Sequence, residues 1–281
     1  MEVNLGETQI VELQPTYSAE QIQGMAVSKR IDAFGQMAKL LQRPKPEDIE
    51  IVTVQKQYES FWSVSATAHY MYERKRVYHV DVPAAEVQSI ILCDREYPVT
   101  INRTRGIDVD TVERCDETLH RDLTLDARTG EVGDFKRYQS AVQQMLPDLA
   151  TLQRAGADVI TPDVRSSFVV RHVIPMLMKT YQADKIIQEV INIESIILCF
   201  HALYAVEYSW AAKQKRQVLI FDAVSGGSKP AVGEMKTRSA KVLTNDTLFD
   251  IGSDAIGTFL PGANISIQLG RLAPRKAVST T

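Results

Sequence analysis

The residues best suited to chemistry in this chain form two short basic clusters with aromatic neighbours. The clusters consist of Arg74, Lys75, Arg76 and of Lys213, Lys215, Arg216. Lysine and arginine neutralise phosphates, and nearby aromatic rings stack on bases, so this pattern suits a nucleic acid. The same cations suit an anionic lipid surface. A structural explanation competes with both, because charged residues at hairpin turns keep strand edges soluble and unpaired.

Both clusters lie within an internal repeat. Residues 64–81 and 206–222 keep the same order of residue types to within one residue, and both strings end in an aspartate. A sequence that repeats in this way indicates a duplicated unit of structure. Strand-forming residues flank each cluster, which predicts a β-hairpin with the cluster at its turn.

The segments that leave the two copies also share a pattern. Asp126 is followed by Gly130, and Asp222 is followed by Gly226. An aspartate with a glycine four residues later predicts a turn, because glycine tolerates a positive φ. The two exits resemble the strand ends of PepSY-type domains over about seven residues each, and this resemblance implies small α+β units. No functional residue is carried over from that family.

The elements that would position the clusters follow from the apolar periodicity. Apolar residues recur at three- and four-residue steps over residues 19–42, after a serine suited to cap a helix, and this predicts one amphipathic helix. Strand patterns follow, a helical pattern returns over residues 135–157, and a third helix is predicted from about residue 164. The acidic residues between 108 and 117 predict a solvated loop.

These elements predict an α+β fold of two related modules, each a helix packed on an antiparallel sheet with a basic-tipped hairpin. The predicted units are an extended arm at residues 1–18, a first module at 19–135, a helical connector at 136–163, a second module at 164–247, and a glycine-punctuated segment with a loose tail at 248–281.

Large apolar residues mark possible surfaces for a partner. Adjacent residues of a strand face opposite sides, so the pairs Phe61-Trp62 and Leu203-Tyr204 each place one large side chain on each face of a sheet. One face must be core, and the other must meet a helix, the second module or a partner. The glycine-punctuated segment is either a docking patch or the closing piece of a core. The partner-surface candidates are Trp62, Tyr204, Phe249, Ile256, Phe259 and Leu260.

Composition and missing motifs limit the possible functions. The net charge is -3, so binding of a polyanion would have to rest on a local patch. The three cysteines are widely spaced, and the sequence contains neither a nucleophile elbow, a phosphate-binding loop nor a zinc-binding spacing. We therefore assign no catalytic residue, no metal ligand and no cofactor. The N-terminus carries no secretory signal and no apolar stretch is long enough to span a bilayer, so we expect a cytoplasmic protein.

The sequence favours a non-catalytic scaffold, adaptor or assembly subunit that acts through contacts with a protein partner or with itself. The alternative is a module that binds nucleic acid or an anionic lipid surface through the two basic tips. The second alternative is an enzyme with a pocket between the two modules.

Overall fold

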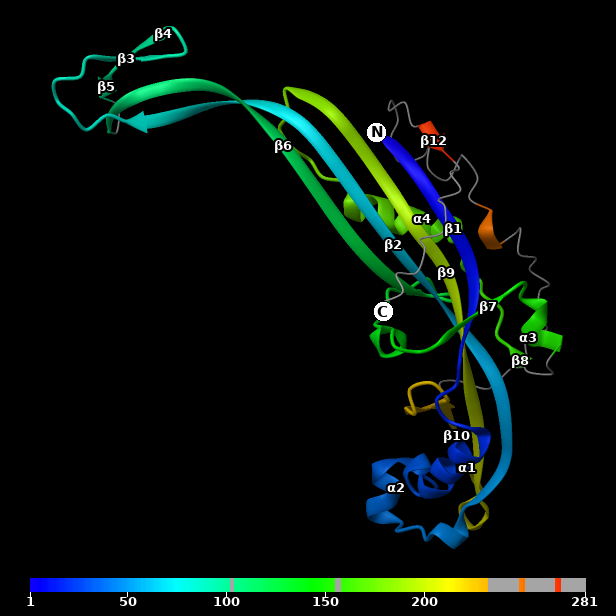
Figure 1. Ribbon diagram of the computed structural model, residues 1–281. Coiled ribbons are helices and arrows are strands. Elements are labelled where there is room, and N and C mark those ends of the chain that lie inside the picture. The colour runs from blue at the N-terminus through cyan, green and yellow to red at the C-terminus, as the bar shows by residue number, and fades with distance from the viewer. Residues whose placement is uncertain (102–103, 155–157, 232–247, 251–265, 269–281) are drawn as a thin grey trace, which may run out of the picture.

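Three exceptionally long strands organise the fold, in a computed structural model that describes residues 1–101, 104–154, 158–231, 248–250 and 266–268 (Figure 1). They are β2 (Glu50–Asp81), β6 (Arg105–Asp126) and β9 (Lys185–Trp210), with 32, 22 and 26 residues. Strands in globular proteins usually have about 5–6 residues. Side chains alternate between buried and more exposed along β2 from Trp62 to Tyr72, as expected of a sheet that covers a core on one face.

The two central strands carry the other elements of the sheet. β2 pairs antiparallel with β9 from Glu50 to Glu73, and its other edge pairs antiparallel with β6. The second edge of β9 is shared by β1 (Glu2–Leu13), which runs parallel to it, and by β10 (Lys215–Asp222), which runs antiparallel. The described part of the sheet has ten strands in all. The smaller members are β5 (Thr100–Ile101), β7 (Gln143–Leu146), β8 (Asp158–Val159), β11 (Ser228–Pro230) and β12 (Ser266–Gln268).

Helices cover the sheet at two places. α4 (Ser166–Leu177) packs on the main core, where Val169, Val170 and Val173 are fully buried with Trp62 and Leu198 of the sheet. At the far end of β9, α1 (Ala19–Ser28) buries its Ile22 and Ala26 against β9 and β10. The remaining helices are short. They are η1 (Asp32–Phe34), α2 (Gly35–Leu41), η2 (Pro46–Asp48), η3 (Lys136–Tyr138), α3 (Ala150–Arg154) and η4 (Ala211–Lys213).

The predicted fold of two modules is wrong, because β2 and β9 lie side by side in one sheet. The first basic cluster, Arg74 to Arg76, is not at a hairpin turn. β2 continues past this cluster and stays paired with β6 as far as Asp81, which lies opposite Gly106 of β6. The second cluster does lie at a turn, formed by η4 between β9 and β10. The two clusters have similar residue types, but the first lies within β2 and the second lies at the turn between β9 and β10.

The helical predictions also need correction. The single helix predicted over residues 19–42 is divided into α1, η1 and α2, and Gly35 at the last break has a φ of 81°. Residues 135–157 were predicted to be helical, but they contain the strand β7 beside η3 and α3. The acidic residues 108–117, predicted as a loop, belong to β6. In each case pairing with a distant strand, or a glycine, overrides the local pattern.

The two aspartate-glycine turns share one geometry. Asp126 Oδ1 accepts hydrogen bonds from the backbone N–H groups of Arg128 and Thr129, at 2.8 and 2.9 Å. Asp222 Oδ1 accepts hydrogen bonds in the same way from the backbone N–H groups of Val224 and Ser225, at 2.8 and 3.1 Å. Gly130 and Gly226 follow with φ values of 75° and 72°. These turns end β6 and β10, so the comparable hairpins are β2–β6 and β9–β10.

We expect Gly130→Ala and Gly226→Ala each to lower the free energy of unfolding by about 1–3 kcal/mol, because a left-handed backbone is strained for alanine. The added Cβ would also approach Phe168 to 2.9 Å or Tyr17 to 2.7 Å. Urea denaturation measures the effect. Gly24→Ala is the matched control, since it lies within α1 and its Cβ would meet nothing within 4 Å. That control should be neutral or stabilising, and equal effects at all three sites would contradict the prediction.

Candidate interaction surface: the β2–β6 ribbon

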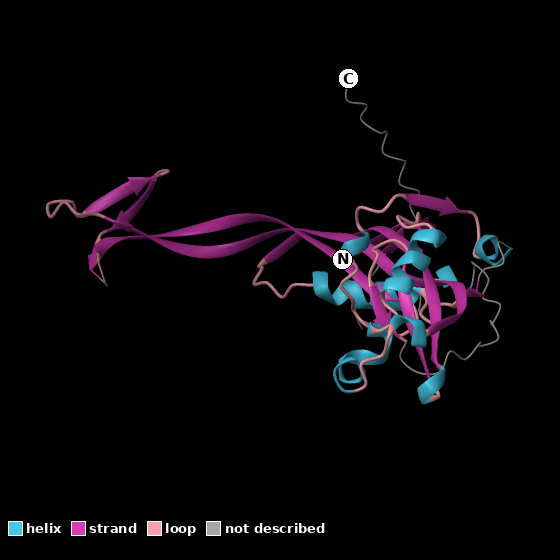
Figure 2. Cartoon of the chain, turned by 90° about the horizontal axis from the view of Figure 1, so that it is seen from below, coloured by secondary structure: helices cyan, strands magenta, loops and turns pink. Residues whose placement is uncertain are grey.

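Beyond Glu73, β2 and β6 leave the sheet as a two-stranded ribbon. β9 begins opposite Glu73, so residues 74–81 of β2 pair only with residues 106–113 of β6. Figure 2 shows this ribbon projecting from the body of the molecule. We call residues 74–81 with 106–113 the ribbon, and residues 82–105 the tip. A two-stranded hairpin on its own is marginally stable in water, so this one needs either internal ties or a partner.

Charged and aromatic side chains tie the two strands together at the base of the ribbon. Arg74 Nε and the Tyr78 hydroxyl each donate a hydrogen bond to the Glu113 carboxylate. These two hydrogen bonds hold the pKa of Glu113 below its ordinary value. Arg114 Nε lies 3.1 Å from Glu73 Oε1 at the neighbouring pair. The first of the predicted polyanion-binding residues is therefore engaged by a carboxylate of the same chain.

A second set of polar ties lies near the distal end of the ribbon. His79 Nδ1 is 2.7 Å from Asp108 Oδ1, and His79 Nε2 is 2.9 Å from Thr104 Oγ1. The Thr104 hydroxyl donates to Asp81 at 2.7 Å. The Thr104 hydroxyl therefore bridges the His79 ring and the Asp81 carboxylate.

One arginine holds the tip in shape. The Arg105 guanidinium donates to four carbonyl groups of the loop that leaves β2, among them those of Val82 at 2.8 Å and Ala85 at 3.2 Å. The loop leads into a small hairpin of β3 (Ser89–Leu92) and β4 (Arg95–Pro98). The two turn residues of this hairpin, Cys93 and Asp94, both have a positive φ, as in a tight type I′ turn. The tip is therefore a built structure, although no core supports it.

Apolar side chains are exposed along this whole projection. Ile91 and Ile101 of the tip are 74% and 78% exposed. The other exposed members are Val77, Tyr78, Val80, Leu92 and Val112. Exposed apolar side chains gathered in one part of a molecule are typical of a protein-binding site.

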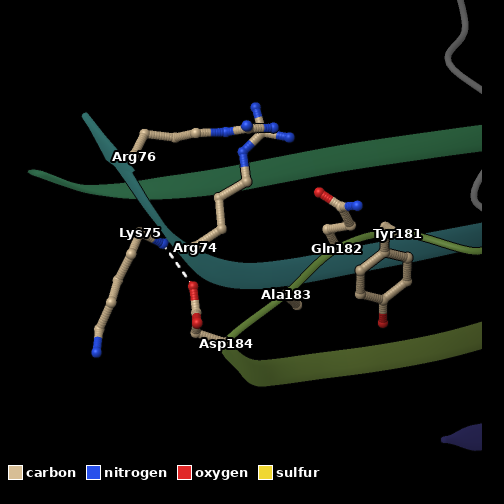
Figure 3. Close-up of a pocket in the computed structure, with 7 residues that line it drawn as sticks. All are labelled: Arg74, Lys75, Arg76, Tyr181, Gln182, Ala183 and Asp184. Carbon is tan, nitrogen blue, oxygen red and sulfur yellow. Dashed lines mark hydrogen bonds between the residues drawn. The ribbon is translucent and has the colours of Figure 1, made fainter. Parts of the chain in front are cut away.

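A pocket of about 400 Å³ lies where the ribbon leaves the body (Figure 3). Residues 74–76 line one side, and residues 181–184 line the other. The Lys75 backbone N–H donates to Asp184 Oδ2 at 2.5 Å. The guanidinium groups of Arg74 and Arg76 lie on one side of β2 in Figure 3, and the Lys75 side chain points away from them, as the alternation of a strand requires.

The structure places the two basic clusters far apart. They lie beyond the two ends of β9, which are separated by about 80 Å along the strand at 3.3 Å per residue. Arg74 is paired with Glu113, and Arg216 Nη1 lies 3.1 Å from Glu207. The side chains that form no ion pair with any described residue are those of Lys75, Arg76, Lys213 and Lys215.

The predicted partner-surface residues are mostly buried where the structure describes them. Trp62 is fully buried, and its indole N–H donates to the Val164 carbonyl at 2.9 Å. The Phe249 ring packs edge-on against Trp62, with centroids 5.5 Å apart. Tyr204 is half-buried between two core clusters. Ile256, Phe259 and Leu260 lie outside the described residues.

The sheet also buries a group of titratable side chains. The Tyr138 hydroxyl donates to Asp222 Oδ2, and His201 Nδ1 lies 3.7 Å from the same oxygen. Burial lowers the pKa of His201 to about 4, although the nearby Asp222 partly opposes this effect. The Tyr138 and His201 rings pack with Phe61 in the third core cluster, beneath the surface. The group is therefore part of the packing of the described core.

Comparison of the chain with models of protein families, with curated proteins and with solved structures found no match. Within the described residues, no helix has the length and apolar character needed to cross a membrane. The same part of the chain contains no cluster of histidine, cysteine and acidic residues arranged to hold a metal ion. The site is therefore assigned from geometry and chemistry alone.

Stability should fall in acid because of His201. Its folded-state pKa of about 4 lies below the ordinary histidine value of about 6.5, so the unfolded chain binds the proton more readily. The contribution of His201 to the free energy of unfolding is complete above pH 6.5 and should decline by up to roughly 3 kcal/mol as the pH falls to 4.

Urea denaturation between pH 4 and 7 measures this decline, and His201→Gln should flatten it. His120→Gln is the control, because His120 is exposed beside Asp122. Equal pH slopes for the wild type and His201→Gln would contradict the assignment.

Proposed function

We propose that this protein is a non-catalytic assembly subunit that docks on another protein through the ribbon and its tip. The observation that carries the proposal is a two-stranded projection in which β2 pairs only with β6 beyond Glu73 among the described residues, with apolar side chains exposed on both strands and at the tip. Fully burying one large aliphatic side chain contributes about 1.5–3 kcal/mol, so covering Ile91, Leu92 and Ile101 would favour association strongly.

The internal ties of the projection support a docking role. Arg105, His79 and the Arg74–Glu113 pair fix the backbone of the ribbon and tip before any partner arrives. A surface that is already ordered loses less conformational entropy on binding, and more of the contact energy then appears as affinity.

The charge of the projection favours a protein partner over a polyanion. Residues 73–114 contain seven lysines and arginines and eight acidic residues. Many of these charges pair across the ribbon, including Arg74 with Glu113 and Arg114 with Glu73. A binder of nucleic acid would carry a clear positive excess on its contact face.

The described residues give little support to an enzyme. The large pKa shifts fall on buried core groups, namely Tyr58, Tyr70, Tyr138, Cys199, His201 and Tyr208. The pocket at the base of the ribbon is lined by cations, Tyr181, Gln182, Ala183 and Asp184. This lining contains no nucleophile paired with a general base.

We propose the cytoplasm as the location of the protein. Cys93, Cys115 and Cys199 are all free thiols. Cys93 is exposed at the tip, on the proposed contact surface. A reducing compartment would keep it from forming disulfides.

Replacing residues 82–105 by Asn-Gly should abolish partner binding and leave the body folded. Asp81 and Gly106 are paired in the ribbon, so a two-residue turn can join them. Cross-linking and affinity capture from cells of origin measure binding, and thermal denaturation checks the fold. Met176→Ser, an exposed change on α4, is the control and should bind normally. A partner captured equally by the shortened variant would contradict the proposal.

Polyanion binding is the second candidate function, favoured by the free side chains of Lys75 and Arg76 beside the pocket. It predicts that labelled single-stranded DNA or anionic vesicles bind at 50 mM salt, and that affinity falls steeply by 200 mM. Lys75→Glu with Arg76→Glu should weaken that binding at least tenfold in fluorescence anisotropy. Lys29→Glu is the control of the same kind. Absence of binding at low salt would remove this function.

A further inference from the structure

A second exposed apolar surface lies at the opposite end of the molecule from the tip. It belongs to α2, where Met37, Leu40 and Leu41 are 69%, 70% and 74% exposed. Ala38 is the only residue that α2 buries. A helix that packs one alanine on its own body gains little from that contact, and no described residue covers its three large apolar side chains.

The two apolar surfaces cannot meet within one molecule. α2 precedes β2, and the tip follows it (Figure 1). β2 has 32 residues and spans about 100 Å at 3.3 Å per residue. Its pairing with β9 and β6 holds this span extended. The tip and α2 of one copy therefore cannot cover each other.

The charges around the two surfaces are opposite in sign. We define the foot as residues 29–49 together with the turn at 211–216, which α2, η1 and η4 share. The foot contains eight lysines and arginines and three acidic residues. Residues 77–112, the projection beyond the first basic cluster, contain three arginines and six acidic residues. The ring of Phe34 packs against Trp210 at 5.6 Å, which places the turn beside the helices of the foot.

We propose that the partner of the tip is a second copy of this chain, docked head to tail so that the tip of one copy covers α2 of the next. The inference rests on the proposed function, because it names the partner of the same surface. The projection beyond the first basic cluster is acidic and the foot is basic, so the two attract each other, whereas two projections or two feet would bring like charges together. Such a contact is heterologous, so it continues into a ring or a filament.

Two variants that introduce a charge test the contact. Ile91→Lys places a cation on the tip opposite the basic foot, and Leu40→Glu places an anion on the foot opposite the acidic projection. Both residues are highly exposed, so both variants should fold. Sedimentation velocity at 10–100 µM and 50 mM salt should show oligomers for the wild type. Each variant alone should associate at least tenfold more weakly, and higher salt should weaken the wild type as well.

Mixing the two variants gives the sharpest result. Ile91→Lys keeps an intact foot and Leu40→Glu keeps an intact tip, so an equimolar mixture should form heterodimers although neither variant associates on its own. Met176→Glu on α4 is the control and should assemble like the wild type. A second measurement uses the exposed thiol of Cys93, which should cross-link to a cysteine placed at Gln42 of another copy.

The outcomes separate this inference from the proposed function. A wild type that stays monomeric at 100 µM and 50 mM salt, or folded variants that form no heterodimer, would overturn the head-to-tail contact. If the shortened ribbon then still abolishes capture of a different protein, the proposed function stands with another partner. Oligomers that persist in Ile91→Lys and in the shortened variant would overturn both.

Discussion

The backbone pairing of β2 with β9 is the constraint on which the rest of this structure depends. These strands stay in register from Glu50 to Glu73, apart from three local shifts, and each carries further strands on its outer edge. α4 and α1 pack on the sheet that this pair supports. Beyond Lys185, the first residue of β9, the sheet narrows to β2 and β6, and the ribbon begins. The place where β9 begins along β2 therefore decides where the body ends and the projection starts.

The inside and the outside of the molecule use polar groups in different ways. Within the body, Tyr138, Asp222 and His201 are buried together, and the carboxylate receives hydrogen bonds from a hydroxyl and from backbone amides. The ribbon and tip contribute no side chain to the core clusters of the described residues, and cross-strand ion pairs and the Arg105 guanidinium hold them in shape. The exposed apolar side chains there do not stabilise the isolated chain, so their benefit arises when another surface covers them.

The sequence predicted local features better than distant ones. The Ser18 cap, the start of α1, the turn at η4 and the two aspartate-glycine exits all depend on neighbouring residues, and their patterns indicated them. The two-module fold failed because alternation reveals a strand but not its partner. The sequence of β6 has no regular period of two, since two or three polar residues separate Val112, Cys115 and Leu119, so the acidic stretch was not marked as a strand. No local pattern distinguishes Arg105 as the residue that holds the tip.

The continuous pairing of β2 with β6 also limits how the projection can change in length. An insertion of one residue in either strand would turn every following side chain to the opposite face of the ribbon. The Arg74–Glu113 and His79–Asp108 pairs would then be broken, and Ile107 would move out of its buried position. Only an even number of residues, added to both strands together, would extend the ribbon and keep its faces. The distance of the tip from the body can therefore change only in steps of two residue pairs, and each step is about 7 Å long.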